Sequence, residues 1–290
     1  MAKSNVGIIG LGIMGSAMAA NLLRAGFTVV GYDPVAACRR RHREAGGVVA
    51  ANAAEVAEAA NIVMLSLPSV LALTEVSDRI AKAKRPRQIL IETSTLPIAA
   101  KEAARKRLAA AGVTLLDCPL SGTGAQARTR DLAVYASGPR AAIRRCVPVF
   151  KGFARIHYDL GKFGNGSKMK FAANLLVAIH NVSTAEAVIL ARRSGLDPAL
   201  AVKVLGDGAG SSRMLQLRGP MMARRAYRDA TMKIEVWQKD MAIIDEFARK
   251  LKSPTPLFSA TRAIYNAAMA QGHARQDTAA VCAVLERKIR

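Results

Sequence analysis

A glycine-rich turn followed by two polar side chains stands near the middle of the chain, at Gly161–Asn174. Lys170 and Asn174 are four residues apart, so a helix would place them on one face. The pKa of a lysine is about 10.4 in model peptides, and burial or a neighbouring positive charge can bring it toward roughly 7 to 8, where the amine exchanges protons. Lys170 is therefore a candidate general acid/base. Lys168 beside it illustrates the ordinary alternative, a solvated lysine on a basic helix.

A second glycine-rich stretch lies near the N-terminus, within Val6–Gly26. Gly10, Gly12 and Gly15 fit GxGxxG, in which the glycines give a tight turn, let backbone approach a pyrophosphate and pack helix against strand. The apolar run before them predicts a strand. Ser16–Ala25 predicts a helix whose first amides would face the phosphates. The pattern taken alone also suits an ordinary turn.

Asp33 supplies the context that the glycine pattern needs. It lies eighteen residues after Gly15, at the end of the predicted strand Phe27–Tyr32. An acid at this position accepts a hydrogen bond from the adenosine ribose of a dinucleotide. The alternative interpretation is a turn residue before Pro34. Because the strand, the glycines, the helix and the acid follow one another in the order and at the spacing of this motif, a dinucleotide site is the strongest inference from the residues.

The elements that would position these residues alternate between strand and helix up to about residue 162. This alternation predicts an α/β fold with a Rossmann-type doubly wound parallel sheet. Ligands of such sheets collect beyond the carboxyl ends of the strands. Three dipeptides follow such ends: Leu67-Pro68, Ser94-Thr95 and Ser121-Gly122. The expected strands are 6–9, 27–32, 48–50, 62–67, 88–92, 113–118, 133–136 and 156–158, and the expected helices are 16–25, 35–45, 53–60, 70–83, 97–111 and 139–149.

Beyond Ser167 the apolar period is helical throughout. A long helix is expected over residues 167–194, followed by further helices with breaks at 206–212, 219–220, 253–256 and 271–277. We therefore expect two domains: residues 1–162 as a dinucleotide-binding domain and residues 163–290 as an all-α substrate and dimerisation domain. The active site of such an enzyme would lie between them.

Composition narrows the class of protein. The 290 residues are 51% hydrophobic and 22% charged, which is typical of a globular chain. No apolar run approaches the roughly 20 residues of a membrane span, and the N-terminus leads straight into the first expected strand, so we expect a cytoplasmic protein. The four cysteines and four histidines are isolated, which favours structural roles and no metal site: Cys38, Cys118, Cys146, Cys282, His42, His157, His180 and His273.

The chain carries a formal net charge of +22, from 43 Lys and Arg against 21 Asp and Glu. Such a field attracts anions, including dinucleotides, carboxylates and nucleic acid. The basic residues are scattered over the expected helices, which is typical of solvated helix faces. Only 4% of the residues are aromatic, which leaves little for base stacking. Specific nucleic-acid binding is therefore not expected.

Three motifs together resemble the 3-hydroxyisobutyrate dehydrogenase family of β-hydroxyacid dehydrogenases, a 6-phosphogluconate dehydrogenase-like group that includes tartronate semialdehyde reductase and L-threonate dehydrogenase. Gly10–Leu22 matches the family motif GLGxMGxxMAxNL, Asp117–Thr123 matches DxPxSGG, and Gly161–Lys170 matches GxxGxGxxxK. The resemblance covers essentially the whole chain. It implies an oxidoreductase that uses NAD or NADP on a small anionic hydroxyacid, and a homodimer or homotetramer paired through the helical region.

The resemblance also implies a role for individual residues. Lys170 would exchange a proton with the β-hydroxyl while hydride passes to or from the nicotinamide. Ser121, Gly122 and Thr123 would hold the substrate, and Asn174 would orient the reacting oxygen. The residues expected to bind the cofactor are Gly10, Leu11, Gly12, Ile13, Met14, Gly15, Asp33, Leu67, Pro68, Thr95 and Lys239.

Three departures from the family pattern bear on specificity. Thr123 replaces the second glycine of the substrate motif, and Ala173 stands where many relatives carry asparagine. Pro34 follows Asp33 where relatives that prefer NADP often have arginine, so the pair favours NAD, although residues 39–41 are all arginine.

Other functions are compatible with parts of the pattern. Imine reductases share the two-domain design but generally lack the lysine, which Lys170 supplies here. The net charge suggests a nucleic-acid-associated relative without turnover, and a sensor that binds NAD without turnover is a further alternative.

Overall fold

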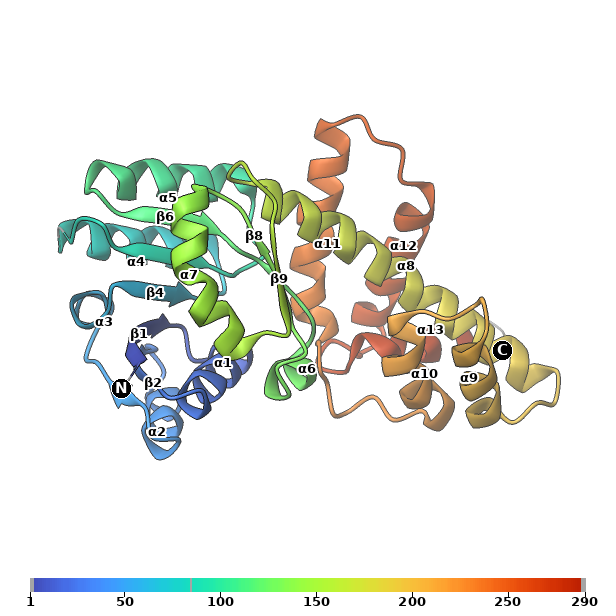
Figure 1. Ribbon diagram of the computed structural model, residues 1–290. Coiled ribbons are helices and arrows are strands. Elements are labelled where there is room, and N and C mark those ends of the chain that lie inside the picture. Colours follow the sequence, from blue (N-terminus) through green and yellow to red (C-terminus); the bar gives the residue numbers. More distant parts are fainter. Residues whose placement is uncertain (1–2, 84, 288–290) are drawn as a thin grey trace. The chain divides into compact units, whose positions relative to one another are not determined.

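The computed structural model describes residues 3–83 and 85–287. The chain forms two compact units, Met1–Lys170 and Phe171–Arg290 (Figure 1). Helix α8, Asn165–Arg193, contains the boundary between them.

The first unit is built on a six-stranded sheet in the order β3-β2-β1-β4-β5-β6, with every neighbouring pair parallel. In a parallel sheet the carboxyl ends of all strands meet at one edge, which is where ligands bind. The strands are β1 (Lys3–Ile9), β2 (Phe27–Tyr32), β3 (Val48–Val49), β4 (Ile62–Leu65), β5 (Ile89–Glu92) and β6 (Thr114–Asp117).

Helices cover both faces of this sheet. Successive strand residues point to opposite faces, so that Ile8 belongs to one buried cluster and Ile9 to the other. The first cluster is closed by α1 (Ile13–Arg24) and α7 (Arg140–Phe153), and the second by α3 (Ala53–Ala59), α4 (Val70–Lys82) and α5 (Ile98–Ala110). Helix α2 (Ala36–Glu44) lies beyond β2. The predicted doubly wound architecture is confirmed.

A small second sheet in the same unit was not expected. It has the order β7-β8-β9, with β7 (Leu120–Ser121) antiparallel to β8 (Ala133–Ala136) and β8 parallel to β9 (Ile156–Asp159). The short helix α6 (Gly124–Arg128) follows β7 directly. The strand β7 and the helix α6 occupy residues for which the sequence pattern predicted no element, because two-residue and five-residue elements are too short to show a period.

The second unit is helical, as expected. It contains most of α8, then α9 (Pro198–Asp207), α10 (Arg213–Arg224), α11 (Ile234–Lys250), α12 (Pro256–Ala270), the 3-10 turn η1 (Thr278–Ala280) and α13 (Val281–Arg287). Within the described ranges, α8 is the one helix whose length and composition would suffice to cross a membrane. Its residues Phe171, Ala178 and Ala185 are buried, as in the core helix of a globular domain.

The break expected at Gly219-Pro220 is wrong, because both residues lie inside α10. A Cβ on Gly219 would come within 2.9 Å of Val202 Cγ1, so the glycine allows α9 and α10 to pack closely. The chain leaves the helix later, at Arg225, which has a left-handed backbone with φ of 52°.

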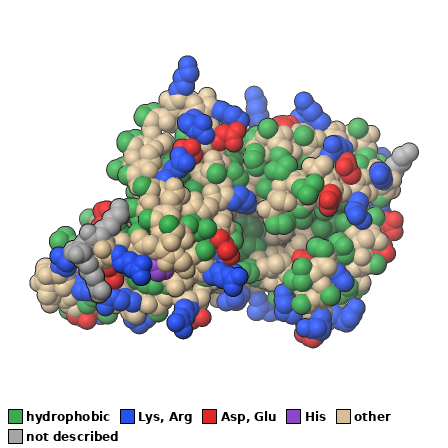
Figure 2. All heavy atoms as spheres, turned by 180° about the vertical axis from the view of Figure 1, so that it is seen from behind, with side chains coloured by type: hydrophobic (Ala, Val, Ile, Leu, Met, Phe, Trp, Pro, Cys, Tyr) green, Lys and Arg blue, Asp and Glu red, His purple; other side chains and the backbone are tan. Residues whose placement is uncertain are grey.

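Basic side chains are scattered among acidic and apolar ones on the face shown in Figure 2. Several basic residues of the chain are paired with acids along a helix, for example Arg40 with Glu44 and Lys250 with Glu246. This distribution is that of solvated helix faces.

Candidate functional site

The glycine loop joins β1 to α1 at the carboxyl edge of the large sheet. Gly10 has a φ of +95°, and a Cβ there would collide with the carbonyl oxygen of Ser66; a Cβ on Gly15 would collide with the carbonyl oxygen of Gly10. Gly12 differs, because a Cβ on it would meet no atom within 4 Å. Gly12 is also the N-cap of α1, where no side chain caps the first turn. The loop is therefore an open cradle with helix amides at its base, which fits a pyrophosphate.

Asp33 closes this cradle from the end of β2. Its Oδ2 accepts a hydrogen bond from Leu11 N at 2.8 Å, and its Oδ1 accepts one from Val35 N at 2.9 Å. The carboxylate is thus held against the glycine loop, and each oxygen keeps lone-pair capacity for a further donor. Arg39 lies alongside, where its Nη1 donates to the carbonyl oxygens of Asp33 and Pro34. This arginine is engaged with backbone at the tip of β2.

The next two strand ends lie side by side at the same edge. Leu67 N donates to Ser94 Oγ at 2.8 Å, and Thr93 Oγ1 donates to the carbonyl oxygen of Leu65 at 2.7 Å. These bonds tie the segment after β4 to the segment after β5. The structure therefore brings Leu67-Pro68 next to Ser94-Thr95, at the edge that also holds the glycine loop.

The motif after β6 forms the start of α6. Ser121 lies in β7 opposite Ala133. Gly122 has a φ of +134°, and a Cβ there would lie 2.5 Å from Leu132 Cδ2, so only glycine fits. Thr123 is the N-cap of α6, and its backbone N–H donates to Gln126 Oε1 at 3.0 Å. Thr123 thus forms a capping box with Gln126 at the start of the helix that follows the substrate motif.

Asp117, at the start of that motif, is fully buried and receives bonds from three directions. Its Oδ1 lies 2.8 Å from Lys101 Nζ, and its Oδ2 accepts from Ser137 Oγ at 3.2 Å and from Ser167 N at 2.8 Å. Sequence reasoning missed Lys101, Ser137 and Ser167. The available signal was an acid at the end of each of two apolar strands, Glu92 and Asp117, which implies a buried cation.

Helix α8 carries residues of both units. Lys170 is the last residue of the first unit, one turn after Ser167. Asn174 belongs to the second unit, where its Nδ2 donates to Asp240 Oδ2 at 3.0 Å. Lys239 Nζ lies 3.6 Å from Asp240 Oδ1. The structure therefore brings the predicted residues Asn174 and Lys239 to one carboxylate, that of Asp240.

Two of the four histidines pack against other groups of the first unit, His42 in a buried position and His157 in a half-buried one. The ring of His42 packs under Gly31 and Gly47, and its Nε2 lies 3.3 Å from the carbonyl oxygen of Val29. Burial lowers the pKa of His42 from its usual value, and backbone contacts offset only part of that effect. His157 stacks near Phe150, with ring centroids 5.6 Å apart.

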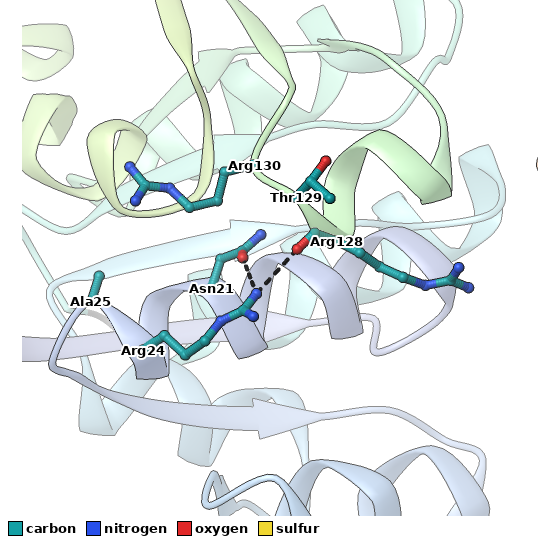
Figure 3. A pocket seen from close by; sticks show the side chains of 6 residues that line it. All are labelled: Asn21, Arg24, Ala25, Arg128, Thr129 and Arg130. Carbon is teal, nitrogen blue, oxygen red and sulfur yellow. Dashed lines mark hydrogen bonds between the residues drawn. The ribbon is translucent and has the colours of Figure 1, made fainter. Parts of the chain in front are cut away.

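A basic pocket lies away from the strand ends, between the C-terminal end of α1 and the end of α6 (Figure 3). Arg24 donates to Asn21 Oδ1 and to the carbonyl oxygen of Arg128, and Asn21 Nδ2 donates to the carbonyl oxygen of Ala127. These bonds satisfy the last carbonyls of α6. Asn21, the lining residue of α1 nearest the glycine loop, lies about 13 Å along the helix from Gly12. The pocket therefore does not belong to the cofactor cradle.

Comparison with known proteins agrees with this geometry. Residues 5–163 match the family model described as the NAD binding domain of 6-phosphogluconate dehydrogenase, and residues 164–285 match NAD-binding of NADP-dependent 3-hydroxyisobutyrate dehydrogenase. The chain is 34% identical to L-threonate dehydrogenase of Cupriavidus necator, over 96% of this chain and 94% of that protein. It is 31% identical to 2-hydroxy-3-oxopropionate reductase of Escherichia coli, over 97% of each.

A solved structure gives the same result in three dimensions. The crystal structure of 3-hydroxyisobutyrate dehydrogenase from Salmonella typhimurium superposes with a TM-score of 0.88 at 28% identity, covering 97% of this chain and 100% of that one. Both family models, full-length relatives above 30% identity and the open glycine cradle lead to the same assignment. The chain belongs to the 3-hydroxyisobutyrate dehydrogenase family of β-hydroxyacid dehydrogenases.

Proposed function

We propose that Lys170 is the general acid/base of this chain, which is an NAD(P)-dependent 3-hydroxyacid dehydrogenase. The observation that carries the proposal is the docking of the first turn of α8 at the carboxyl edge of the sheet, through Ser167 and Asp117. The glycine cradle opens at the same edge. Lys170 follows Ser167 by one helical turn, so its amine would serve chemistry at that edge.

Different residues would bind different parts of the dinucleotide. The amides of the first turn of α1, above Gly12, would hold the pyrophosphate, and Asp33 would accept from the adenosine ribose. Leu67-Pro68, Thr95 and Lys239 would border the nicotinamide, which supplies a hydride acceptor or donor when bound. We propose NAD over NADP, because the Asp33 carboxylate repels a 2′-phosphate and Arg39 is engaged with the backbone carbonyl oxygens of Asp33 and Pro34.

The substrate residues would position a small anionic hydroxyacid. The Ser121 hydroxyl and the Gly122 N–H are donors suited to a carboxylate, and Thr123 adds a methyl and a hydroxyl beside them. Asn174 would orient the reacting oxygen. Lys170, as the neutral amine, takes the proton of the β-hydroxyl during oxidation and returns it to the oxygen during reduction.

The substrate and assembly are proposed from the relatives. The name of the Cupriavidus necator relative supports threonate as the first candidate substrate, and that of the Escherichia coli relative supports 2-hydroxy-3-oxopropionate. We further propose that the enzyme is cytoplasmic and forms a homodimer or homotetramer through residues 163–290. A sedimentation mass near the 30.8 kDa of one chain at working concentration would contradict the assembly.

The test is nicotinamide absorbance with NAD and NADP separately, over β-hydroxyacids from 3-hydroxyisobutyrate to threonate. Lys170→Ala is expected to lower kcat by about 10²- to 10⁴-fold, the usual contribution of a general acid/base. Cofactor affinity, measured by nucleotide fluorescence, should persist. Lys168→Ala is the matched control, because Lys168 is exposed and its Nζ donates to Asn165 Oδ1 at 3.2 Å, within the same turn. Equal rates in native protein and Lys170→Ala would exclude the acid/base role.

A further inference from the structure

A buried ammonium group joins the strand ends on which the proposed site is built. Lys101 projects from α5 into the interior, and its side chain is 0% exposed. Its Nζ lies 2.6 Å from Glu92 Oε2 and 2.8 Å from Asp117 Oδ1, and it donates to the carbonyl oxygen of Ser94 at 2.7 Å. Two of these contacts are hydrogen bonds and the contact to Glu92 is an ion pair, so three oxygen atoms surround the ammonium. Lys101 thus connects the ends of β5 and β6.

The charge of this cluster is balanced by backbone donors. Two carboxylates face one ammonium, which leaves one formal negative charge. Glu92 Oε1 accepts from Ser94 N at 2.9 Å, and Asp117 Oδ2 accepts from Ser167 N, in the first turn of α8, at 2.8 Å. Amides at a helix N-terminus stabilise a carboxylate. Burial acts to lower the pKa of Lys101, but the two carboxylates raise it overall, so the ammonium stays charged.

The same cluster fixes the start of α8. Ser167 Oγ donates to Asp117 Oδ1 at 2.8 Å, and Gly166 N donates to Ser137 Oγ at 3.0 Å. A Cβ on Gly166 would lie within 2.7 Å of the Asp117 carbonyl oxygen, so only glycine allows this close approach. The first turn of the helix therefore has one position on the sheet edge. Lys170 is three residues further on the same face of that helix.

The cluster also reaches the segment expected to border the nicotinamide. Ser94, whose carbonyl oxygen accepts from Lys101, uses its Oγ to accept from Leu67 N at 2.8 Å. One buried side chain is therefore connected to the segments after β4, β5 and β6 and to the start of α8. A residue that only fills the core would need no such pattern of bonds. The bonds of Lys101 link the segment proposed to border the nicotinamide with the helix that carries Lys170.

We propose that Lys101, acting through Asp117 and Ser167, is a positioning residue that holds Lys170 and the segment at Leu67 in one arrangement. The expected effect of Lys101 on turnover rests on the proposed function of Lys170. The expected effect of Lys101 on the position of α8 is independent of that function. A displacement of about 1 Å in such a positioned group is enough to lower turnover by up to roughly 10²-fold.

The experiment combines hydrogen exchange with steady-state kinetics on the full chain. Ser167→Ala removes one bond to Asp117 and leaves the ion cluster intact. The double variant Lys101→Met with Glu92→Gln removes the hub while keeping one formal negative charge, which guards against unfolding. Ser167→Thr, which keeps the hydroxyl, is the conservative variant. Lys106→Met, at an exposed position on the same helix α5, is the control.

Both network variants should speed amide exchange in residues 163–172 by about 10-fold or more, since local opening becomes easier. Ser167→Ala should lower kcat by roughly 10-fold with the KM for cofactor within about 2-fold, as expected of lost positioning. Ser167→Thr should recover most of both, and Lys106→Met should match the native protein.

Unchanged exchange at residues 163–172 in both network variants would overturn the inference, as would faster exchange confined to α5. The kinetics separate this failure from that of the proposed function. A native protein that turns over no hydroxyacid would contradict the dehydrogenase proposal, while the exchange comparison would still decide whether Lys101 positions α8.

Discussion

The glycines of the cofactor loop meet different physical demands at neighbouring positions. At Gly10 and Gly15 a side chain would collide with backbone carbonyl oxygens of the chain itself. At Gly12 a Cβ would meet no atom within 4 Å, so no contact within the chain requires glycine there. We therefore propose that Gly10 and Gly15 are needed for folding and that Gly12 is needed for binding the cofactor.

We therefore predict different outcomes for two single-methyl substitutions. Gly15→Ala should destabilise the first unit by about 1–3 kcal/mol or more, as overpacking against a fixed backbone does. Gly12→Ala should lower the free energy of unfolding by no more than about 1 kcal/mol, the cost of alanine at an N-cap, and weaken NAD binding by about 10-fold or more, because the methyl occupies the path of the pyrophosphate. Urea unfolding and nucleotide fluorescence measure the two effects. Equal affinity in Gly12→Ala and native protein would contradict the cradle.

His42 makes the stability of the first unit depend on pH. Its pKa is lowered in the folded state, mainly by burial. Above the unfolded pKa of about 6.5 both states are neutral; below it the unfolded state binds a proton that the folded state resists, so stability falls by up to about 1.4 kcal/mol per pH unit.

The measurement is urea unfolding of native protein and His42→Gln at pH 7.5, 6.5 and 5.5. The difference in unfolding free energy between them should shrink as the pH falls, since the glutamine does not titrate. A difference that is constant across this range would argue against a buried neutral His42.

At the scale of elements, the second unit is held together by a buried ion pair between α10 and the segment before η1. Arg218 Nε donates to Asp277 Oδ1 at 2.9 Å, and Asp277 Oδ2 accepts from Thr231 N, Thr231 Oγ1 and Met232 N at 2.7, 2.8 and 3.1 Å. One carboxylate thus fixes α10, the loop before α11 and the start of η1.

Asp277→Asn should destabilise the second unit by about 3–5 kcal/mol, because Arg218 would remain buried without its counter-charge. Burial raises the pKa of Asp277, but Arg218 and the surrounding donors lower it overall. The contribution is therefore present above the unfolded pKa and is lost as pH falls through the lowered folded pKa, so the loss in Asp277→Asn should be the same from pH 5 to 8. Glu246→Gln, at an exposed pair, should cause no measurable change in thermal unfolding.

At the scale of the whole molecule, the net charge of +22 acts on anionic ligands over a distance. At 0.1 M salt the screening length is about 10 Å, so exposed charges further apart than this interact only weakly. The Kd for NAD should therefore rise by a factor on the order of 10 between 0.05 and 0.5 M NaCl, through slower association. An uncharged osmolyte at matched osmolality is the control, and stopped-flow fluorescence would show whether the association rate carries the change. A Kd independent of salt would contradict the argument.

Local pattern alone determined the doubly wound sheet, the glycine loop, Asp33 at the tip of β2 and the long helix that carries Lys170. Each depends on neighbours within a few residues, through period, turn chemistry and caps. Residues close together in the sequence were enough to predict these features, because the backbone geometry of a strand or helix repeats every few residues.

Tertiary structure decided the rest. Gly219-Pro220 lies inside α10, where the absence of a Cβ on Gly219 leaves room for Val202 of α9. The two-residue strand β7 pairs with β8, twelve or more residues further along the chain, and a capping box begins the five-residue helix α6. Lys101 became a buried hub because Asp117, 16 residues away, lies beside it in space. Charge burial is decided by partners that folding brings together, and no local period encodes them.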